Sequence, residues 1–134
     1  MTLALPLLLT SCEREDDINA IFRGTTWYLT YIKNGEKQSE TKKRYSINFV
    51  NDNFEAVMSG GARITGKWRA DGASHSFGCS NIHVTGSVAG DSIAEKMYSI
   101  LTNAKRYSGT TTWLQIIQDN NTFMQFRNWY DNGR

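Results

Sequence analysis

The sequence has little excess charge, few cysteines and no familiar catalytic motif. Fifteen lysines and arginines against thirteen aspartates and glutamates leave a formal net charge of +2, which is too small to indicate nucleic-acid binding. The basic run at residues 42–44 lies between periodic segments, where solvated loops are expected. The chain contains no Gly-x-Ser-x-Gly, His-Glu-x-x-His or phosphate-loop sequence, so the common hydrolase and nucleotide-binding signatures are excluded.

Long apolar runs are scarce, and the first nine residues are the main exception. This run is far shorter than the roughly 20 residues that a membrane-spanning helix needs. A short apolar run that ends in small residues is typical of a cleaved export signal. The sequence Leu9-Thr10-Ser11-Cys12 resembles the bacterial lipobox, in which the cysteine is lipidated and the signal is cut before it. We therefore predict a lipoprotein signal peptide at residues 1–11 and lipid attachment at Cys12.

The flanks of this motif refine the prediction. A signal peptide normally opens with a basic residue, and this one does not, so we expect the signal to be N-terminally incomplete. Residues 13–17 are charged and mostly acidic, and residues 12–22 are predicted to be a solvated tether. An acidic cluster after the lipidated cysteine resembles the surface-export signal of some Gram-negative lineages. The expected location is the cell envelope, in the outer membrane, facing the periplasm or the cell surface. A soluble protein with a chance apolar N-terminus is the alternative.

Two cysteines and two histidines limit redox and metal chemistry. A lipidated Cys12 has no thiol to pair with Cys79, so Cys79 is expected to be a small buried apolar residue. The pattern His75-x-x-x-Cys79-x-x-x-His83 has metal-ligand residue types, but its glycine- and serine-rich surroundings favour a strand. Strand residues four apart are separated by roughly 13 Å, whereas zinc ligands lie roughly 2.0–2.3 Å from one ion. We therefore predict no metal site and no cofactor.

Alternating apolar and polar residues predict several β-strands separated by polar turns. The predicted strands cover residues 25–33, 44–50, 54–58, 62–69, 74–85, 111–118 and 122–127. The clearest alternation places Ala62, Ile64, Gly66 and Trp68 on one face and Arg63, Thr65, Lys67 and Arg69 on the other. The residues expected in the core are Trp27, Tyr45, Phe49, Trp68, Trp113, Leu114, Ile116, Met124 and Phe126. The residues expected to cap turns or a helix start are Asp52, Asp71, Asp91 and Asp119.

A single late helix is predicted at about residues 92–106. Ser92 and Glu95 have the spacing of a capping box, and Asp91 adds negative charge at the helix start. Apolar residues follow at helical spacing, and Lys105 and Arg106 suit a helix C-terminus. The fold expected from these elements is mainly β (α+β). It is a single antiparallel, strongly curved sheet or small barrel, covered by the helix, over residues 23–128, with a tail at 129–134.

The order of these elements resembles that of the META-domain lipoproteins over roughly residues 25–127. The segments that carry the resemblance are Thr26-Trp27-Tyr28-Leu29, Ile47-Asn48-Phe49, Ile64-x-Gly66-x-Trp68, the helix at 95–101 and the closing pair Leu114-x-Ile116 and Phe123-x-x-Phe126. Gly60-Gly61-Ala62 stands where that family typically has Gly-Cys-Asn. A second similarity is to lipocalin-type barrels, through the opening Gly24-Thr25-Thr26-Trp27-Tyr28. Both resemblances imply a curved β-structure without catalytic machinery, and the first implies a link to envelope stress.

The expected function is that of a non-enzymatic cell-envelope lipoprotein, held to the membrane by its lipid. It would be a monomeric binding or stress-related module for a protein or a small apolar ligand. Three alternatives remain open at this point: an inhibitor of an envelope-acting enzyme, a purely structural envelope protein, and an enzyme with an unfamiliar site near His75, Cys79 and His83. A deep apolar cavity, a flat aromatic patch or converging histidines and carboxylates would discriminate between these functions.

Overall fold

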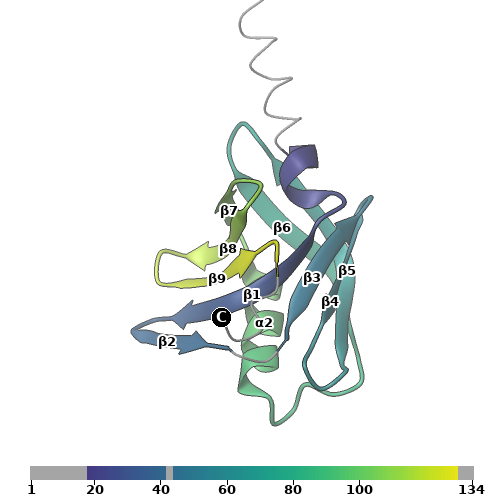
Figure 1. Cartoon of the computed structure of the whole chain (residues 1–134), viewed down its shortest axis with the longest axis vertical. Coiled ribbons are helices and arrows are strands. Elements are labelled where there is room, and N and C mark those ends of the chain that lie inside the picture. The colour runs from purple at the N-terminus through teal and green to yellow at the C-terminus, as the bar shows by residue number, and fades with distance from the viewer. Residues whose placement is uncertain (1–17, 42–43, 130–134) are drawn as a thin grey trace, which may run out of the picture.

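The computed structural model describes residues 18–41 and 44–129 (Figure 1). A helical segment at residues 18–22 leads into a sheet of nine strands, interrupted by the helix α2. The elements are β1 (Thr26–Asn34), β2 (Lys37–Glu40), β3 (Ser46–Val50), β4 (Asn53–Val57), β5 (Arg63–Asp71), β6 (Ser76–Thr85), α2 (Ser92–Asn103), β7 (Arg106–Gly109), β8 (Trp113–Asp119) and β9 (Thr122–Arg127). None of the helices in these ranges is long and apolar enough to cross a membrane.

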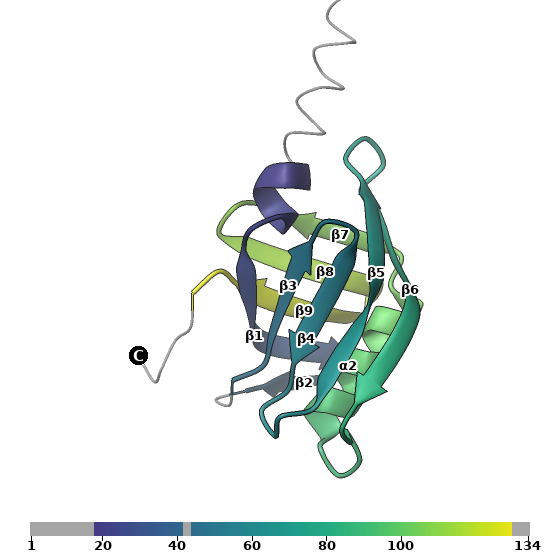
Figure 2. The ribbon, with the colours of Figure 1, turned by 90° about the vertical axis from the view of Figure 1, so that its right-hand side faces the viewer.

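Every pairing between the named strands is antiparallel, and the sheet closes on itself. Its strand order is β2-β1-β3-β4-β5-β6-β7-β8-β9, and an additional pairing joins β9 to β1. One edge of β1 pairs with β3 near Thr26 and with β2 near Asn34, while its other edge pairs with β9. The strands therefore follow one another around a ring (Figure 2). This confirms the predicted mainly β fold, with one strongly curved antiparallel sheet and one late helix.

The joint between β6 and β7 is the narrowest in the ring. Ser76 and Arg106 form its one residue pair, and backbone hydrogen bonds from Phe77 to Lys105 (2.9 Å) and from Tyr107 to His75 (3.0 Å) flank it. Helix α2 packs against β6, β8 and β9, and it buries Ala94, Met97, Ile100 and Leu101. The helix thus covers the side of the ring on which β6 and β7 diverge (Figure 2).

Aromatic side chains fill the interior of the ring near the helical segment at 18–22. Phe22 is fully buried, and its ring lies 4.9 to 5.6 Å from those of Phe49, Trp68, Phe77 and Tyr107. The other predicted core residues Trp27, Tyr45, Leu114, Ile116, Met124 and Phe126 are buried as well. Trp113 differs from the prediction, because it faces outward opposite Arg127 and is only partly buried.

Residues 12–22 were predicted to be a solvated tether, and this prediction is wrong for residues 18–22, which belong to the folded domain. Ile18, Ile21 and Phe22 are buried in the hydrophobic core. The Ile21 carbonyl also accepts a hydrogen bond from the indole nitrogen of Trp27 at 2.9 Å. The folded domain therefore begins before the predicted boundary at residue 23. Cys12, residues 13–17 and the predicted signal peptide lie outside the described residues, as does the tail beyond Trp129.

The helix is shorter than predicted and is capped by a different residue. Its end at Asn103 precedes the predicted end at 106, because Ala104 adopts an extended conformation and Lys105 donates a backbone hydrogen bond to Ile117 at 2.9 Å. The next residue, Arg106, begins β7 rather than ending the helix. Asp91, not Ser92, is the N-cap, since its carboxylate accepts a hydrogen bond from the Ala94 nitrogen at 3.1 Å.

Candidate ligand-binding site

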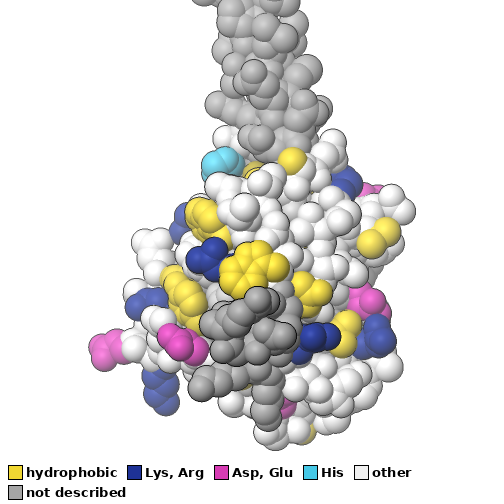
Figure 3. Space-filling view, viewed as in Figure 1, with side chains coloured by type: hydrophobic (Ala, Val, Ile, Leu, Met, Phe, Trp, Pro, Cys, Tyr) yellow, Lys and Arg dark blue, Asp and Glu magenta, His cyan; other side chains and the backbone are white. Residues whose placement is uncertain are grey.

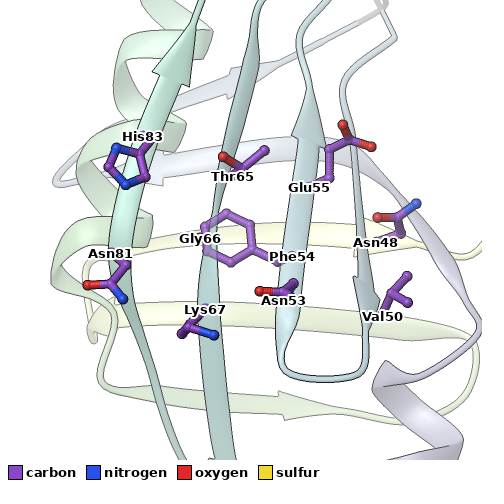
Figure 4. A pocket seen from close by; sticks show the side chains of 10 residues that line it. All are labelled: Asn48, Val50, Asn53, Phe54, Glu55, Thr65, Gly66, Lys67, Asn81 and His83. Atoms are coloured by element: carbon purple, nitrogen blue, oxygen red, sulfur yellow. The ribbon is translucent and has the colours of Figure 1, made fainter.

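The outer face of β3–β6 carries a solvent-open pocket of about 590 Å³ (Figure 4). Strands β3 and β4 contribute five of its lining residues, and β5 and β6 contribute the other five. The lining residues are Asn48, Val50, Asn53, Phe54, Glu55, Thr65, Gly66, Lys67, Asn81 and His83. These side chains carry three amides, a hydroxyl, a carboxylate, an amine and an imidazole, together with the apolar groups of Val50 and Phe54.

Antiparallel pairing brings these side chains together. Glu55 stands opposite both Asn48 on β3 and Thr65 on β5, and Thr65 stands opposite His83 on β6. Residues directly opposite one another in a sheet point to the same face, so the outward positions form a row across all four strands. Lys67 stands opposite Asn53 in a second row. The hydrophobic alternation that buries Ile64 and Trp68 thus also places these polar side chains on one outer surface.

An irregularity in β5 and β6 shapes the floor of the pocket. The register between these strands shifts between Thr65 and Lys67, and Asn81 has a positive φ of 52°. A Cβ atom on Gly66 would lie 2.8 Å from both the Phe54 ring and the Ser80 carbonyl oxygen. Glycine is therefore required at this point, because the buried Phe54 ring occupies the space that a side chain would need (Figure 4).

The amide groups of the pocket are not engaged with their surroundings. The side chains of Asn48, Asn53 and Asn81 have no hydrogen-bond partner among the described residues, and Lys67 has neither a hydrogen bond nor an ion pair within the same set. An asparagine side chain offers two donor hydrogens and one acceptor oxygen, and a lysine offers three donors. The pocket therefore presents donors and acceptors that solvent or a ligand must satisfy.

The charges around the pocket are unequal. The Glu55 carboxylate forms an ion pair with Arg63 at 2.7 Å, so its charge is locally offset. Both side chains are about half exposed, and such surface pairs contribute little to stability. Lys67 has no acidic partner among the described residues, and counting Arg63 beside Glu55 gives two positive charges against one negative charge at this surface.

The residues singled out for metal or thiol chemistry do not converge. His83 points outward into the pocket, Cys79 lies opposite the buried Trp68, and His75 is in the turn before β6 with its ring 5.1 Å from that of Tyr107. Among residues 18–41 and 44–129, no group of three His, Cys, Asp or Glu side chains is placed to hold a metal ion. Burial raises the pKa of the Cys79 thiol to about 12, against a smaller lowering by Arg69. Cys79 is therefore a packed, protonated thiol and a poor nucleophile at neutral pH.

The predicted capping role of the turn aspartates is confirmed at three positions. Asp71 accepts hydrogen bonds from the Ala73 nitrogen and the Ser74 hydroxyl, and Asp119 accepts one from the Asn121 nitrogen. Asp91 caps α2 as described above. These carboxylates are engaged with local backbone, as short acidic side chains at turns usually are.

A second pocket of about 500 Å³ lies at the start of α2, and two of its lining residues, Tyr45 and Asp91, are hydrogen-bonded to each other. The Tyr45 hydroxyl lies 3.0 and 2.9 Å from the two Asp91 oxygens. Burial, together with the hydrogen bond to Asp91 and its charge, raises the pKa of Tyr45 to about 12. This arrangement joins the residue before β3 to the helix N-terminus, so the Tyr45 hydroxyl and the Asp91 carboxylate are both engaged within the fold.

A family model described as a domain of unknown function, DUF4847, matches residues 13–128. The chain belongs to the DUF4847 family. A crystal structure of a DUF4847 family protein from Bacteroides vulgatus ATCC 8482 is similar, with a TM-score of 0.67 and 18% sequence identity over 85% of this chain and 99% of that chain. At this identity the likeness to that DUF4847 structure shows the fold alone. Comparison with curated proteins gave no match.

The pocket on β3–β6 was not predicted from sequence. The alternation at 62–69 did indicate a polar, cationic face that includes Thr65 and Lys67. The asparagines at 48, 53 and 81 fall on three different strands, and only the observed register brings them to one surface. Their recurrence at outward positions was the one available signal.

Proposed function

We propose that the protein is a non-enzymatic cell-envelope lipoprotein whose domain binds a soluble ligand at the pocket on β3–β6. The observation that carries this proposal is a set of polar side chains around that pocket, such as Asn48, Asn53 and Lys67, that have no partner within residues 18–41 and 44–129. Surface amides at this density are positioned for recognition, because a ligand can satisfy several of them at once.

The packed interior of the ring favours a ligand that binds on the outer surface rather than inside the ring. Phe22 and its four ring neighbours fill the space near the helical segment, and Leu114, Ile116 and Phe126 are fully buried. Interiors packed in this way admit no guest without displacing core side chains. This favours an external, hydrogen-bonding ligand over the apolar ligand that a lipocalin-like cavity would carry.

The envelope address rests on the lipobox-like sequence at Leu9-Thr10-Ser11-Cys12. Intact mass and membrane fractionation would test it on the protein expressed with a complete signal peptide. We expect a mature chain that starts at Cys12 and carries acyl mass, and we expect the Cys12→Ala variant to leave the membrane fraction. Membrane attachment that persists in this variant would contradict lipid anchoring.

Binding at the pocket can be tested by a backbone amide NMR titration of the mature protein. The probes would be an acidic trisaccharide, the matching neutral trisaccharide, a short extended peptide and a C16 fatty acid. The proposal expects at least one polar probe to shift amide signals of β3–β6 selectively. A response to the fatty acid at inward residues such as Leu114 and Phe126, with no response at the pocket, would overturn it.

A further inference from the structure

We infer that the pocket on β3–β6 binds an acidic sugar, that is, a sugar unit bearing a carboxylate beside free hydroxyls. This inference rests on the proposed binding function and names its ligand class. Its basis is the combination of free amides with one unpaired amine on the same open surface (Figure 4).

The amides select for hydroxyl groups. Each of Asn48, Asn53 and Asn81 presents both donors and an acceptor, and a sugar hydroxyl likewise donates and accepts. A ligand without such groups would exclude water from these amides and leave their donors and acceptors unpaired, which would lower its affinity. The exposed Val50 and the underlying Phe54 ring offer limited apolar contact to the C–H edge of a sugar.

The charge distribution adds the preference for a carboxylate. Lys67 lies between Asn81 on one side and Asn53 on the other (Figure 4), and it has no acidic partner among the described residues. The one carboxylate of the lining, on Glu55, is offset by Arg63 at 2.7 Å. A sugar carboxylate near Lys67 would gain a charge-assisted hydrogen bond, while the hydroxyls would face Thr65 and Glu55.

The sheet topology leaves no open edge on β3, β4 or β5 to which an extended peptide could add, although β6 pairs with β7 only at Ser76. Strands β3, β4 and β5 are each paired on both edges, so their backbones are already occupied. Peptide recognition by strand addition needs an open edge of the sheet. The pocket volume of about 590 Å³ falls within the range of small-molecule sites, roughly 300–1,000 Å³, and leaves room for more than one sugar unit.

The test is isothermal titration of the mature protein with trigalacturonic acid at low ionic strength. Lys67→Met removes the charge but keeps much of the side-chain length, and it is expected to weaken binding about tenfold or more. Lys67→Arg keeps the charge and should restore most of the affinity. Lys33→Met, on β1 away from the pocket, is the matched control and should bind as the parent does. Circular dichroism melting of each variant checks that it folds.

Competing probes separate the possible failures. Equal affinity for the neutral trisaccharide of the same linkage would overturn the acidic preference, while leaving the binding function in place. Equal affinity for citrate or inorganic phosphate would overturn the assignment of a sugar ligand and would show a site for simple anions. Equal loss in Lys33→Met and Lys67→Met would overturn the location. No response of the β3–β6 amides to any polar probe would overturn the proposed function together with this inference.

Discussion

The two outer faces of the ring use similar residues in opposite ways. On the face of β3–β6, the amides of Asn48 and Asn53 have no partner among the described residues. On the face of β1, β8 and β9, Gln115 donates a hydrogen bond to the side chain of Gln125 at 2.8 Å. The rings of Tyr31 and Phe123 on that face also meet edge to face at 6.0 Å.

This difference separates groups committed to the fold from groups free to bind. Figure 3 views the face of β1, β8 and β9, where hydrophobic side chains gather near the middle with Lys and Arg side chains among them. Its amides and rings satisfy one another, so they stabilise the sheet. On the pocket face Glu55 pairs with Arg63, but the amides of Asn48 and Asn53 have no partner among the described residues. Exposure alone would not reveal this difference, whereas the hydrogen-bond partners do.

The largest contrast is expected between two tryptophans. Trp68 points inward from β5, under the cation of Arg23, and its indole donates to the Asn51 carbonyl at 3.0 Å. Trp68→Ala should lower the free energy of unfolding by about 3–5 kcal/mol, as large core truncations do. Trp113→Ala, on the outer face of β8, should cost about 1 kcal/mol. Urea unfolding followed by circular dichroism measures both, and equal losses would contradict the assignment of inward and outward faces.

The next effect concerns two glycines, of which Gly66 lies in the floor of the pocket on β3–β6 and Gly60 lies in the turn between β4 and β5. Gly66→Ala would place a methyl group 2.8 Å from the Phe54 ring and the Ser80 carbonyl oxygen, and we expect a loss of about 1–3 kcal/mol from overpacking. Gly60→Ala meets nothing within 4 Å and should change stability by less than about 0.5 kcal/mol. The same unfolding measurement applies. A harmless Gly66→Ala would mean that the floor of the pocket is loosely packed.

Amide pairing itself can be measured with two double-mutant cycles. Replacing Gln115 and Gln125 by alanine, singly and together, should give a coupling energy of about 0.5–1.5 kcal/mol, the usual net contribution of a hydrogen bond. The same cycle on Asn48 and Asn53 should give a coupling near zero, because neither side chain is hydrogen-bonded within the described part of the chain. Substantial coupling between these asparagines would show that the pocket face is also committed to the fold.

The last effect is a loss of stability at alkaline pH that comes from Tyr45, a buried residue on neither outer face. Burial and Asp91 raise the pKa of Tyr45 from 10.0 to about 12, so the folded state resists deprotonation more than the unfolded state does. This contribution is fully present below pH 10 and is lost as the pH rises toward 12. Urea midpoints between pH 8 and pH 11.5 should therefore fall less steeply in Tyr45→Phe. Both proteins would carry Cys79→Ala, which removes the thiol whose pKa is also raised. Identical dependence of the urea midpoint on pH, with and without Tyr45→Phe, would contradict the raised pKa of Tyr45.

Hydrophobic alternation was sufficient to predict much of the sheet. It identified the buried face of β5 and the inward residues of the last two strands, such as Leu114 and Phe126, because burial of one face imposes a period of two. The turn aspartates were predicted for an equally local reason. Strands β2 and β7 were not predicted, because they have four residues each and carry no apolar alternation. They are strands only through their backbone pairing with neighbouring strands.

Other features depended on contacts distant in sequence. The helical segment at 18–22 was assigned to the tether because it follows an acidic run, although Phe22 lies at the centre of the aromatic cluster. The helix end was misplaced because the backbone pairing of Lys105 with Ile117 outweighs the favourable charge at a helix terminus. The pocket depends on the shift of register beside Gly66, which no spacing within one strand predicts.

The narrow joint between β6 and β7 affects how the ring responds to cold. Backbone pairing there consists of the Ser76–Arg106 pair and the two hydrogen bonds that flank it. Much of the closure therefore rests on the apolar side of α2, where Met97, Ile100 and Leu101 are buried. Hydrophobic stabilisation weakens as temperature falls. We therefore expect amide protons on either side of this joint to exchange sooner near freezing, relative to the rest of the sheet, than they do at 25 °C.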